Sequence, residues 1–256
     1  VMLSKNRMIW RRFTVALFFQ LLTERLLLFI IPLLVYKHTG SASMTGFMVF
    51  LEWLPTIIFL PIAGRISDIL GNLRCLKTSI LIRLVLCFLT AYFLTGKTIT
   101  ESYSYLTFLA SALSLLNTQS FVSLEGSLPG HFTEDYIPKA YSLIQGFLQT
   151  SLVVGPLIGG FFLQHFSTPQ IFMTTAVMYL ISVIFYQMAF GKDQKIEIKS
   201  DSLSLKPIFS AFSFVIRNKF ILTMTLASFS MNFFMGTIIT LVPKHIIEVF
   251  GQSEQE

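Results

Sequence analysis

Five ionisable residues stand inside long apolar stretches of this sequence, where charge is unusual. They are Glu24, Arg25, Glu52, Arg83 and Glu125. A charged side chain in the middle of a bilayer costs at least about 2.5–3.5 kcal/mol, so each needs an opposite charge or a wet cavity. A carboxylic acid in such a place can take up and release a proton. These residues are therefore candidates for coupling a proton movement to another process.

The helical rise of about 1.5 Å per residue gives each charge a depth in the membrane. Arg25 and Glu52 are expected at the same level on neighbouring helices, which predicts an ion pair between them. Arg83 and Glu125 are expected near the cytoplasmic ends of adjacent helices, where they either pair or extend to water.

Glu24 then remains as the candidate proton carrier. Gln20 and Glu24 are four positions apart, so they share one helical face that could line a central cavity. The alternative is a structural salt bridge between Glu24 and Arg25.

The composition indicates that these residues lie in an integral membrane protein. The chain is 54% hydrophobic and 12% charged, and it contains 27 Phe. Soluble proteins carry about 25% charged residues, which is what a water-facing surface requires. The net charge of +6 could suggest nucleic acid. Here, however, the basic residues are distributed between apolar runs, which is typical of membrane topology.

Seven apolar stretches are long enough to cross a bilayer as helices, which takes roughly 20 residues each. The predicted spans are Phe13–Tyr36, Gly46–Gly64, Thr78–Leu94, Tyr105–Gly126, Ala140–Gln164, Gln170–Phe190 and Phe220–Pro243. In lipid the backbone must satisfy its hydrogen bonds internally, so the fold class is an all-α membrane protein. The connections alternate in their content of Lys and Arg. One set, together with the N-terminal segment, holds 14 of these residues, whereas the other set contains only Lys37, Lys97 and Lys244. The positive-inside rule therefore places the N-terminus in the cytoplasm.

The chain divides into three predicted parts. Residues 1–190 form a six-helix transmembrane bundle, and residues 191–219 form a charged cytoplasmic linker. Apolar residues at helical spacing in the linker predict an amphipathic helix along the inner membrane face. Residues 220–256 contain the first helix of an incomplete second bundle.

Motifs for enzymatic chemistry are absent from the sequence. It contains no His-Glu-x-x-His or Gly-x-Ser-x-Gly pattern and no phosphate-binding loop. Cys75 and Cys87 provide neither a disulfide framework nor a metal-ligand spacing. We expect no catalytic residues, no metal and no cofactor.

The connection between the second and third spans contains Gly64, Asp68, Gly71 and Arg74 in the pattern G-x-x-x-D-x-x-G-x-x-R. This loop resembles the signature loop of the major facilitator superfamily, in which it belongs to the conformational gate. The sequence departs from the family pattern at Asn72 and Leu73, where basic residues are usual.

The fifth span contains Gly155, Pro156, Gly159 and Gly160, which resemble the G-P-x-x-G-G element of the proton-coupled antiporters in that superfamily. Small residues also allow close helix packing in any membrane protein. Two further stretches, 32–41 and 129–142, resemble a subgroup of macrolide-efflux and siderophore-export proteins.

The resemblance implies a proton-coupled exporter of small amphipathic molecules, a drug or a siderophore, in the plasma membrane of a bacterium. Its partners would be the lipid bilayer, a small-molecule substrate, protons and a C-terminal half in the same or another chain. Nucleic acid is not expected as a partner. The alternatives are a nutrient uptake symporter or uniporter of the same fold, and a truncated fragment that does not transport.

Small polar residues on the spans are candidates for a substrate path. They are Gln20 on the first span, Ser114 and Thr118 on the fourth, and Ser228 and Asn232 on the seventh. Helix packing is the alternative for the last two groups. The resemblance also implies an arginine within the fourth span, but residues 115–119 read Leu-Leu-Asn-Thr-Gln.

Overall fold

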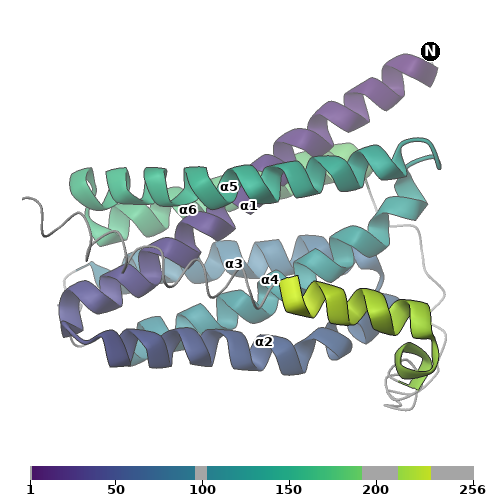
Figure 1. The fold of residues 1–256 in the computed structure, drawn as a ribbon. Coiled ribbons are helices and arrows are strands. Elements are labelled where there is room, and N and C mark those ends of the chain that lie inside the picture. Colours follow the sequence, from purple (N-terminus) through teal and green to yellow (C-terminus); the bar gives the residue numbers. More distant parts are fainter. Residues whose placement is uncertain (1, 96–102, 192–212, 232–256) are drawn as a thin grey trace, which may run out of the picture. The chain divides into compact units, whose positions relative to one another are not determined.

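The computed structural model describes residues 2–95, 103–191 and 213–231. It divides into two compact units, residues 1–200 and 201–256, and each is described by itself. The described part of the first unit consists of six long helices and short connections (Figure 1). They are α1 (Met2–Thr39), α2 (Ala42–Leu70), α3 (Asn72–Leu94), α4 (Tyr103–His131), α5 (Ile137–His165) and α6 (Thr168–Phe190).

Each of the first six predicted spans lies within one of these helices, which confirms an all-α fold. The helices extend beyond the predicted apolar stretches. The extension of α3 is the one that changes the predicted position of a charged residue. This helix begins at Asn72, six residues before the expected Thr78. The early start follows from Gly71, which is the only residue between α2 and α3 and has φ of 95°. Glycine adopts this backbone conformation at little cost, so the chain reverses in a single residue.

The second unit is described over a short part of its length. A helix runs over Lys219–Met231, and all of it except Lys219 lies in the predicted seventh span. The remainder of that span and residues 192–212 of the predicted amphipathic linker lie outside the described residues.

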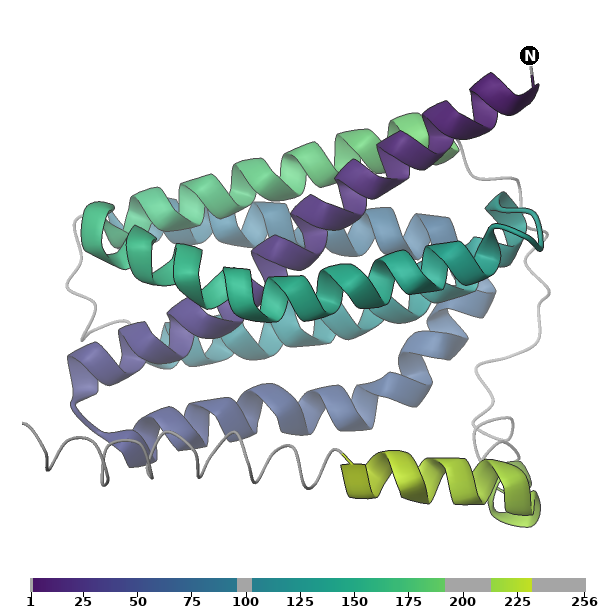
Figure 2. The same ribbon diagram turned by 45° about the horizontal axis from the view of Figure 1, so that its top comes forward.

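The helix α1 is the centre of the first unit. It packs against α5 and α6. The helix α3 packs against both α6 and α4, and α4 in turn packs against α2. Figures 1 and 2 show α1 running obliquely between these neighbours. More than half of its apolar stretch, 56%, is buried, against 17% for α2 and for α5. The two charges midway along α1, Glu24 and Arg25, therefore lie where this helix packs against its neighbours.

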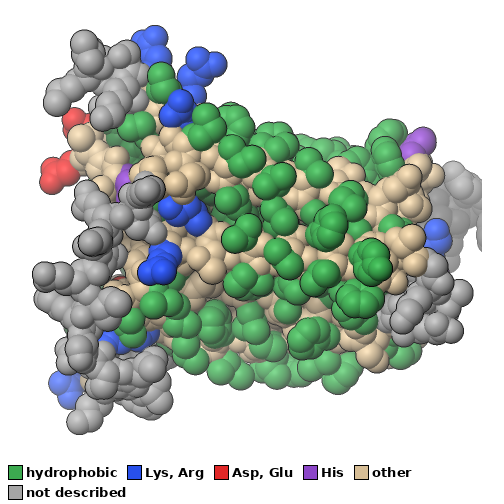
Figure 3. All heavy atoms as spheres, turned by 180° about the vertical axis from the view of Figure 1, so that it is seen from behind, with side chains coloured by type: hydrophobic (Ala, Val, Ile, Leu, Met, Phe, Trp, Pro, Cys, Tyr) green, Lys and Arg blue, Asp and Glu red, His purple; other side chains and the backbone are tan. Residues whose placement is uncertain are grey.

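The outer surface of the bundle is apolar. On the face shown in Figure 3, hydrophobic side chains cover the long sides of the helices, and most visible Lys and Arg side chains lie toward one end. Within the described residues, five helices are long and apolar enough to cross a membrane: α1, α2, α3, α5 and α6. The helix α4 is also long but carries a run of buried polar residues, which include Thr118, Gln119, Ser120 and Ser123. These polar residues face other helices, and they form part of the site described next.

Candidate functional site

Glu24 on α1 and Arg83 on α3 form a buried ion pair. Glu24 Oε1 lies 2.5 Å from Arg83 Nη1, and the two side chains are 7% and 1% exposed. Arg83 also donates from Nη2 to Ser120 Oγ on α4 at 2.6 Å. Its guanidinium lies 4.9 Å from the ring centre of Tyr179 on α6 and contacts the Tyr179 hydroxyl at 3.5 Å. Four helices therefore meet around this cation.

Glu24 accepts further hydrogen bonds from its own helix and from α4. Gln20 Nε2 donates to Glu24 Oε1 at 3.0 Å, and the Tyr186 hydroxyl donates to Gln20 Oε1 at 2.8 Å. With its amide nitrogen turned toward Glu24, Asn117 donates to both carboxylate oxygens, at 3.1 and 2.9 Å. Hydrogen bonds of this kind are what allow an ion pair to persist away from water. The surroundings of Glu24 are therefore arranged for a carboxylate.

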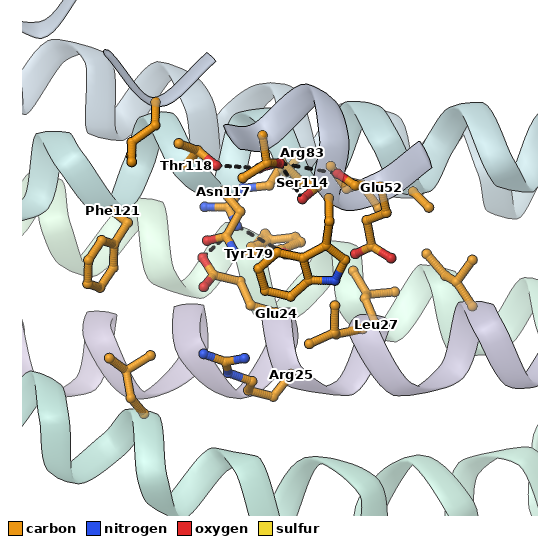
Figure 4. Close-up of a pocket in the computed structure, with 18 residues that line it drawn as sticks. Glu24, Arg25, Leu27, Glu52, Arg83, Ser114, Asn117, Thr118, Phe121 and Tyr179 are labelled. Carbon is orange, nitrogen blue, oxygen red and sulfur yellow. Dashed lines mark hydrogen bonds and ion pairs between the residues drawn. The ribbon is translucent and has the colours of Figure 1, made fainter. Parts of the chain in front are cut away.

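A cavity of about 280 Å³ lies beside the ion pair. Glu24, Arg83 and Tyr179 border it, and Asn117 and Thr118 line its α4 wall (Figure 4). Much of the remaining wall is apolar, and its side chains include Leu27, Ile31, Trp53, Leu113 and Phe121. An apolar pocket with a few placed polar groups is the usual form of a small-molecule site. Its volume is just below the roughly 300–1,000 Å³ typical of such sites.

The expected ion pair between Arg25 and Glu52 does not form. Both residues line the cavity, but neither side chain has a hydrogen bond or ion pair with a described residue. Glu24 and Arg25 are neighbours on α1 and diverge. Glu24 points toward Asn117 and Tyr179, whereas Arg25 points away from them (Figure 4). Equal depth was therefore insufficient evidence for contact, and the alternative salt bridge between Glu24 and Arg25 was also wrong.

Arg83 and Glu125 were expected near the ends of adjacent helices, either paired or extending to water, and this placement was wrong for Arg83, which pairs with Glu24. Because α3 begins at Asn72, Arg83 lies midway along this helix rather than near its cytoplasmic end. Glu125 lies in the last part of α4 and is partly exposed. The fourth span lacks the arginine that the resemblance implies, whereas the buried Arg83 of α3 donates a hydrogen bond to Ser120 on α4.

Polar residues on α4 hold this helix against α2. The Ser114 and Thr56 hydroxyls are 2.8 Å apart, and those of Ser67 and Ser123 are 2.7 Å apart. Gln119 Nε2 donates to Ser67 Oγ at 2.8 Å. Ser114 also lines the cavity. Helix packing and cavity lining are therefore combined on this face of α4.

The connection between α2 and α3 is a tight reversal that also contacts α4. Gly71 closes α2 by donating its N–H to the Ser67 carbonyl at 2.9 Å. Asn72 Nδ2 donates to the Gly126 carbonyl on α4 at 2.8 Å. Asp68 and Arg74 are exposed, and a Cβ on Gly64 would have no described atom within 4 Å. Asn72 stands where the family pattern usually has a basic residue, and in this chain it contacts α4.

Two of the small residues on α5 are required by close contact with α1. A Cβ on Gly155 would lie 3.0 Å from Arg25 Cβ and 3.1 Å from the Arg25 carbonyl carbon. A Cβ on Gly159 would lie 2.7 Å from Phe29 Cδ1. Gly160 has no described atom within 4 Å of that position, and Pro156 lies inside the helix. The α5 surface at Gly155 and Gly159 therefore faces α1.

The sequence comparison gives the family. Residues 13–255 match the family described as Major Facilitator Superfamily. The chain belongs to the Major Facilitator Superfamily. No match to the chain was found among curated proteins. Members of this superfamily are multi-pass integral membrane transporters of small molecules, and they are carriers rather than enzymes.

The remaining candidates for a substrate path are not among the described residues that line the cavity. Gln20 on α1 is fully buried against α6, where it donates to Glu24 and accepts from Tyr186, and it does not line the cavity. Ser228 is exposed on the helix of the second unit. Asn232 lies outside the described residues.

Sequence reasoning missed the residues that surround Arg83. Ser120 and Tyr179 bind the guanidinium, and Asn117 binds its partner Glu24. A signal was present for α4, because residues 117–120 read Asn-Thr-Gln-Ser in an otherwise apolar stretch. No comparable signal marked Tyr179, since a single tyrosine in an apolar span is unremarkable.

Proposed function

We propose that this protein is a proton-coupled transporter that exports small amphipathic molecules, such as a drug or a siderophore. In this proposal Glu24 carries the proton, and its ion pair with Arg83 is the element that responds to it. The observation that carries the proposal is the position of Glu24. Its side chain is 7% exposed, it is paired with Arg83, and it borders the cavity.

Protonation of Glu24 changes what holds the helices together. The carboxylate attracts Arg83 and so connects α1 to α3. A neutral acid no longer makes an ion pair, while Arg83 keeps its bonds to Ser120 and Tyr179. The connection between α1 and the α3–α4 side of the cavity is therefore weakened by a proton. Facilitators work by rocking two six-helix halves about a midplane site, and such a bond is a suitable control for that motion.

An exchange of protons for substrate is consistent with a cavity that contains both the proposed proton carrier and the proposed substrate site. Because Glu24 borders the space in which a substrate would bind, one occupant affects the other directly. Proton entry and substrate exit then become alternate steps, which is antiport. The Gly155 and Gly159 contact with α1 supports this direction through the resemblance to antiporters. A second six-helix half, in the same chain or another, is the partner in this motion, and the N-terminus is cytoplasmic.

The test uses protein expressed from its complete gene and reconstituted in liposomes. Wild-type protein should convert an imposed proton gradient into uphill movement of an amphipathic fluorescent dye. Glu24→Gln together with Arg83→Gln should keep downhill dye exchange but lose the uphill movement, because the amide cannot titrate. Glu125→Gln is the matched control, since this carboxyl lies outside the cavity and should leave coupling intact.

Two outcomes would contradict the proposal. Gradient-driven dye movement that persists in the double variant would show that Glu24 is not the proton carrier. Dye accumulation in the direction of the proton flow would identify an uptake symporter rather than an exporter.

A further inference from the structure

The cavity contains two charged side chains that no described residue satisfies. Glu52 on α2 is 7% exposed, and its carboxylate faces the space that Glu24 and Leu27 also border (Figure 4). Arg25 on α1 lines the same space and is half-buried. Neither side chain makes a hydrogen bond or ion pair within the described parts of the chain.

These charges restrict what can bind in the cavity. A neutral apolar molecule would displace water from Glu52 and Arg25 and would offer them nothing in return. Burying a charge without a partner is costly, so such a molecule is disfavoured. A cation would pair with Glu52 and leave Arg25 without an opposite charge. An anion would pair with Arg25 and leave Glu52 without one. A molecule that carries both charges on an apolar body satisfies the whole cavity.

We propose that the cavity binds amphipathic zwitterions. Glu52 receives the cationic group, Arg25 receives the anionic group, and the apolar wall receives the body of the molecule. This inference rests on the proposed function, because it takes the cavity to be the transport site. It narrows the substrate class from amphipathic molecules to those with one charge of each sign.

The neighbours of each charge suit these roles. Trp53 follows Glu52 in the chain and also lines the cavity, and an indole ring attracts cations. The guanidinium of Arg25 offers paired N–H donors that match the two oxygens of a carboxylate. Leu27, Leu113 and Phe121 provide apolar surface in the same cavity for the body of the molecule.

Three ligands with a shared naphthyl group test the proposal. Naphthylalanine is a zwitterion, naphthylethylamine lacks its carboxylate, and naphthylpropionic acid lacks its amine. Binding is measured by equilibrium dialysis at neutral pH, with the protein from its complete gene in lipid nanodiscs. Wild-type protein should bind naphthylalanine about tenfold more tightly than either relative, since each charge-assisted contact contributes about this factor. This comparison requires no variant.

Two variants then assign the charges. Glu52→Gln should weaken naphthylalanine about tenfold and leave naphthylpropionic acid unchanged. Arg25→Gln should weaken naphthylalanine similarly and leave naphthylethylamine unchanged. Glu125→Gln is the control that should change none of the three. Neither cavity variant should be less stable than the parent, because each removes a charge that has no partner among the described residues.

Other outcomes overturn the inference. Equal affinity for the three ligands, or binding of none, would show that the cavity does not select zwitterions. Equal weakening of all three by Glu52→Gln, together with lower stability, would show that Glu52 is paired with a group of the second half. No gradient is used, so loss of proton coupling in Glu24 variants leaves this result untouched, and the two proposals can fail separately.

Discussion

Glu24 and Arg83 are 59 positions apart in the chain and form an ion pair of 2.5 Å in the structure. The pair joins the first and third helices, and Arg83 extends the connection to Ser120 on α4 and Tyr179 on α6. Its 1% exposure means that the guanidinium depends on these partners rather than on water. Stability and the proposed proton response therefore depend on the same few atoms.

Arg83→Gln should destabilise the protein strongly. It leaves the buried Glu24 carboxylate without its cation, and breaking a buried pair from one side typically costs about 3–5 kcal/mol. The expected result is a marked loss of thermal stability in detergent, measured by fluorescence-detected size-exclusion after heating. Arg25→Gln is the matched control, because Arg25 has no partner among the described residues and its loss should change little.

Replacing both members of the pair should recover much of that stability. Glu24→Gln with Arg83→Gln leaves two neutral amides in place of one uncompensated charge. A double variant that is as unstable as Arg83→Gln alone would indicate that Ser120 and Tyr179, rather than Glu24, are the contacts that matter for Arg83.

Gly155→Leu should impair folding or expression, because α1 and α5 touch at this position. Even a Cβ there would lie 3.0–3.1 Å from Arg25 atoms, including the backbone carbonyl carbon, which cannot move without α1. Over-packing of this kind typically costs about 1–3 kcal/mol. The measurement is expression together with melting temperature in detergent.

Gly160→Leu provides the control on the same helix. Its Cβ position has no described atom within 4 Å, so the added side chain should be tolerated. If both variants behave like the parent, the close approach of α1 and α5 is incorrect.

The sequence predicted the helices well and their contacts poorly. Apolar length and the need for internal hydrogen bonds were sufficient to locate the first six spans. The start of α3 was misplaced because residues 72–77 include Arg74 and Lys77, which look like loop residues although they continue the helix. That error moved Arg83 toward the membrane surface and removed it from consideration as the partner of Glu24.

The pairing of charges failed for a second physical reason. The helical rise gives depth, but it does not give the direction in which a side chain leaves its helix. Glu24 and Arg25 occupy nearly the same depth, but Glu24 bonds to residues of α3 and α4, whereas the Cβ and backbone of Arg25 lie beside Gly155 on α5. The glycines at 155 and 159 could be interpreted from sequence as contact residues, because their size implies close packing wherever the neighbour lies.

Asp68→Asn should reduce transport without reducing stability, if the loop between α2 and α3 belongs to the conformational gate. Asp68 is exposed, so the change removes a charge from the surface and leaves the buried core unaltered. The expected result is normal insertion and melting temperature with most dye transport lost in liposomes. Asp135→Asn is the matched control, since Asp135 is also exposed and lies in the α4–α5 turn. Wild-type flux in Asp68→Asn would show that the loop only reverses the chain.

The contact between Asn72 and Gly126 should behave as a single coupled unit. Asn72 Nδ2 donates to the Gly126 carbonyl at 2.8 Å, and a Cβ on Gly126 would lie 2.7 Å from Asn72 Oδ1. Gly126→Ala therefore displaces the Asn72 side chain and loses the hydrogen bond, which is worth about 0.5–1.5 kcal/mol. Asn72→Ala should lose the same bond by removing the donor.

Because both changes break one interaction, combining them should add little. The double variant Asn72→Ala with Gly126→Ala is expected to match the single variants in melting temperature, a non-additive result that indicates direct contact. The loss at Gly126 should also be smaller than that at Gly155, since a surface amide can move aside and the α1 backbone cannot. Fully additive losses would show that the loop and α4 are stabilised independently, and that Asn72 has no role in joining them.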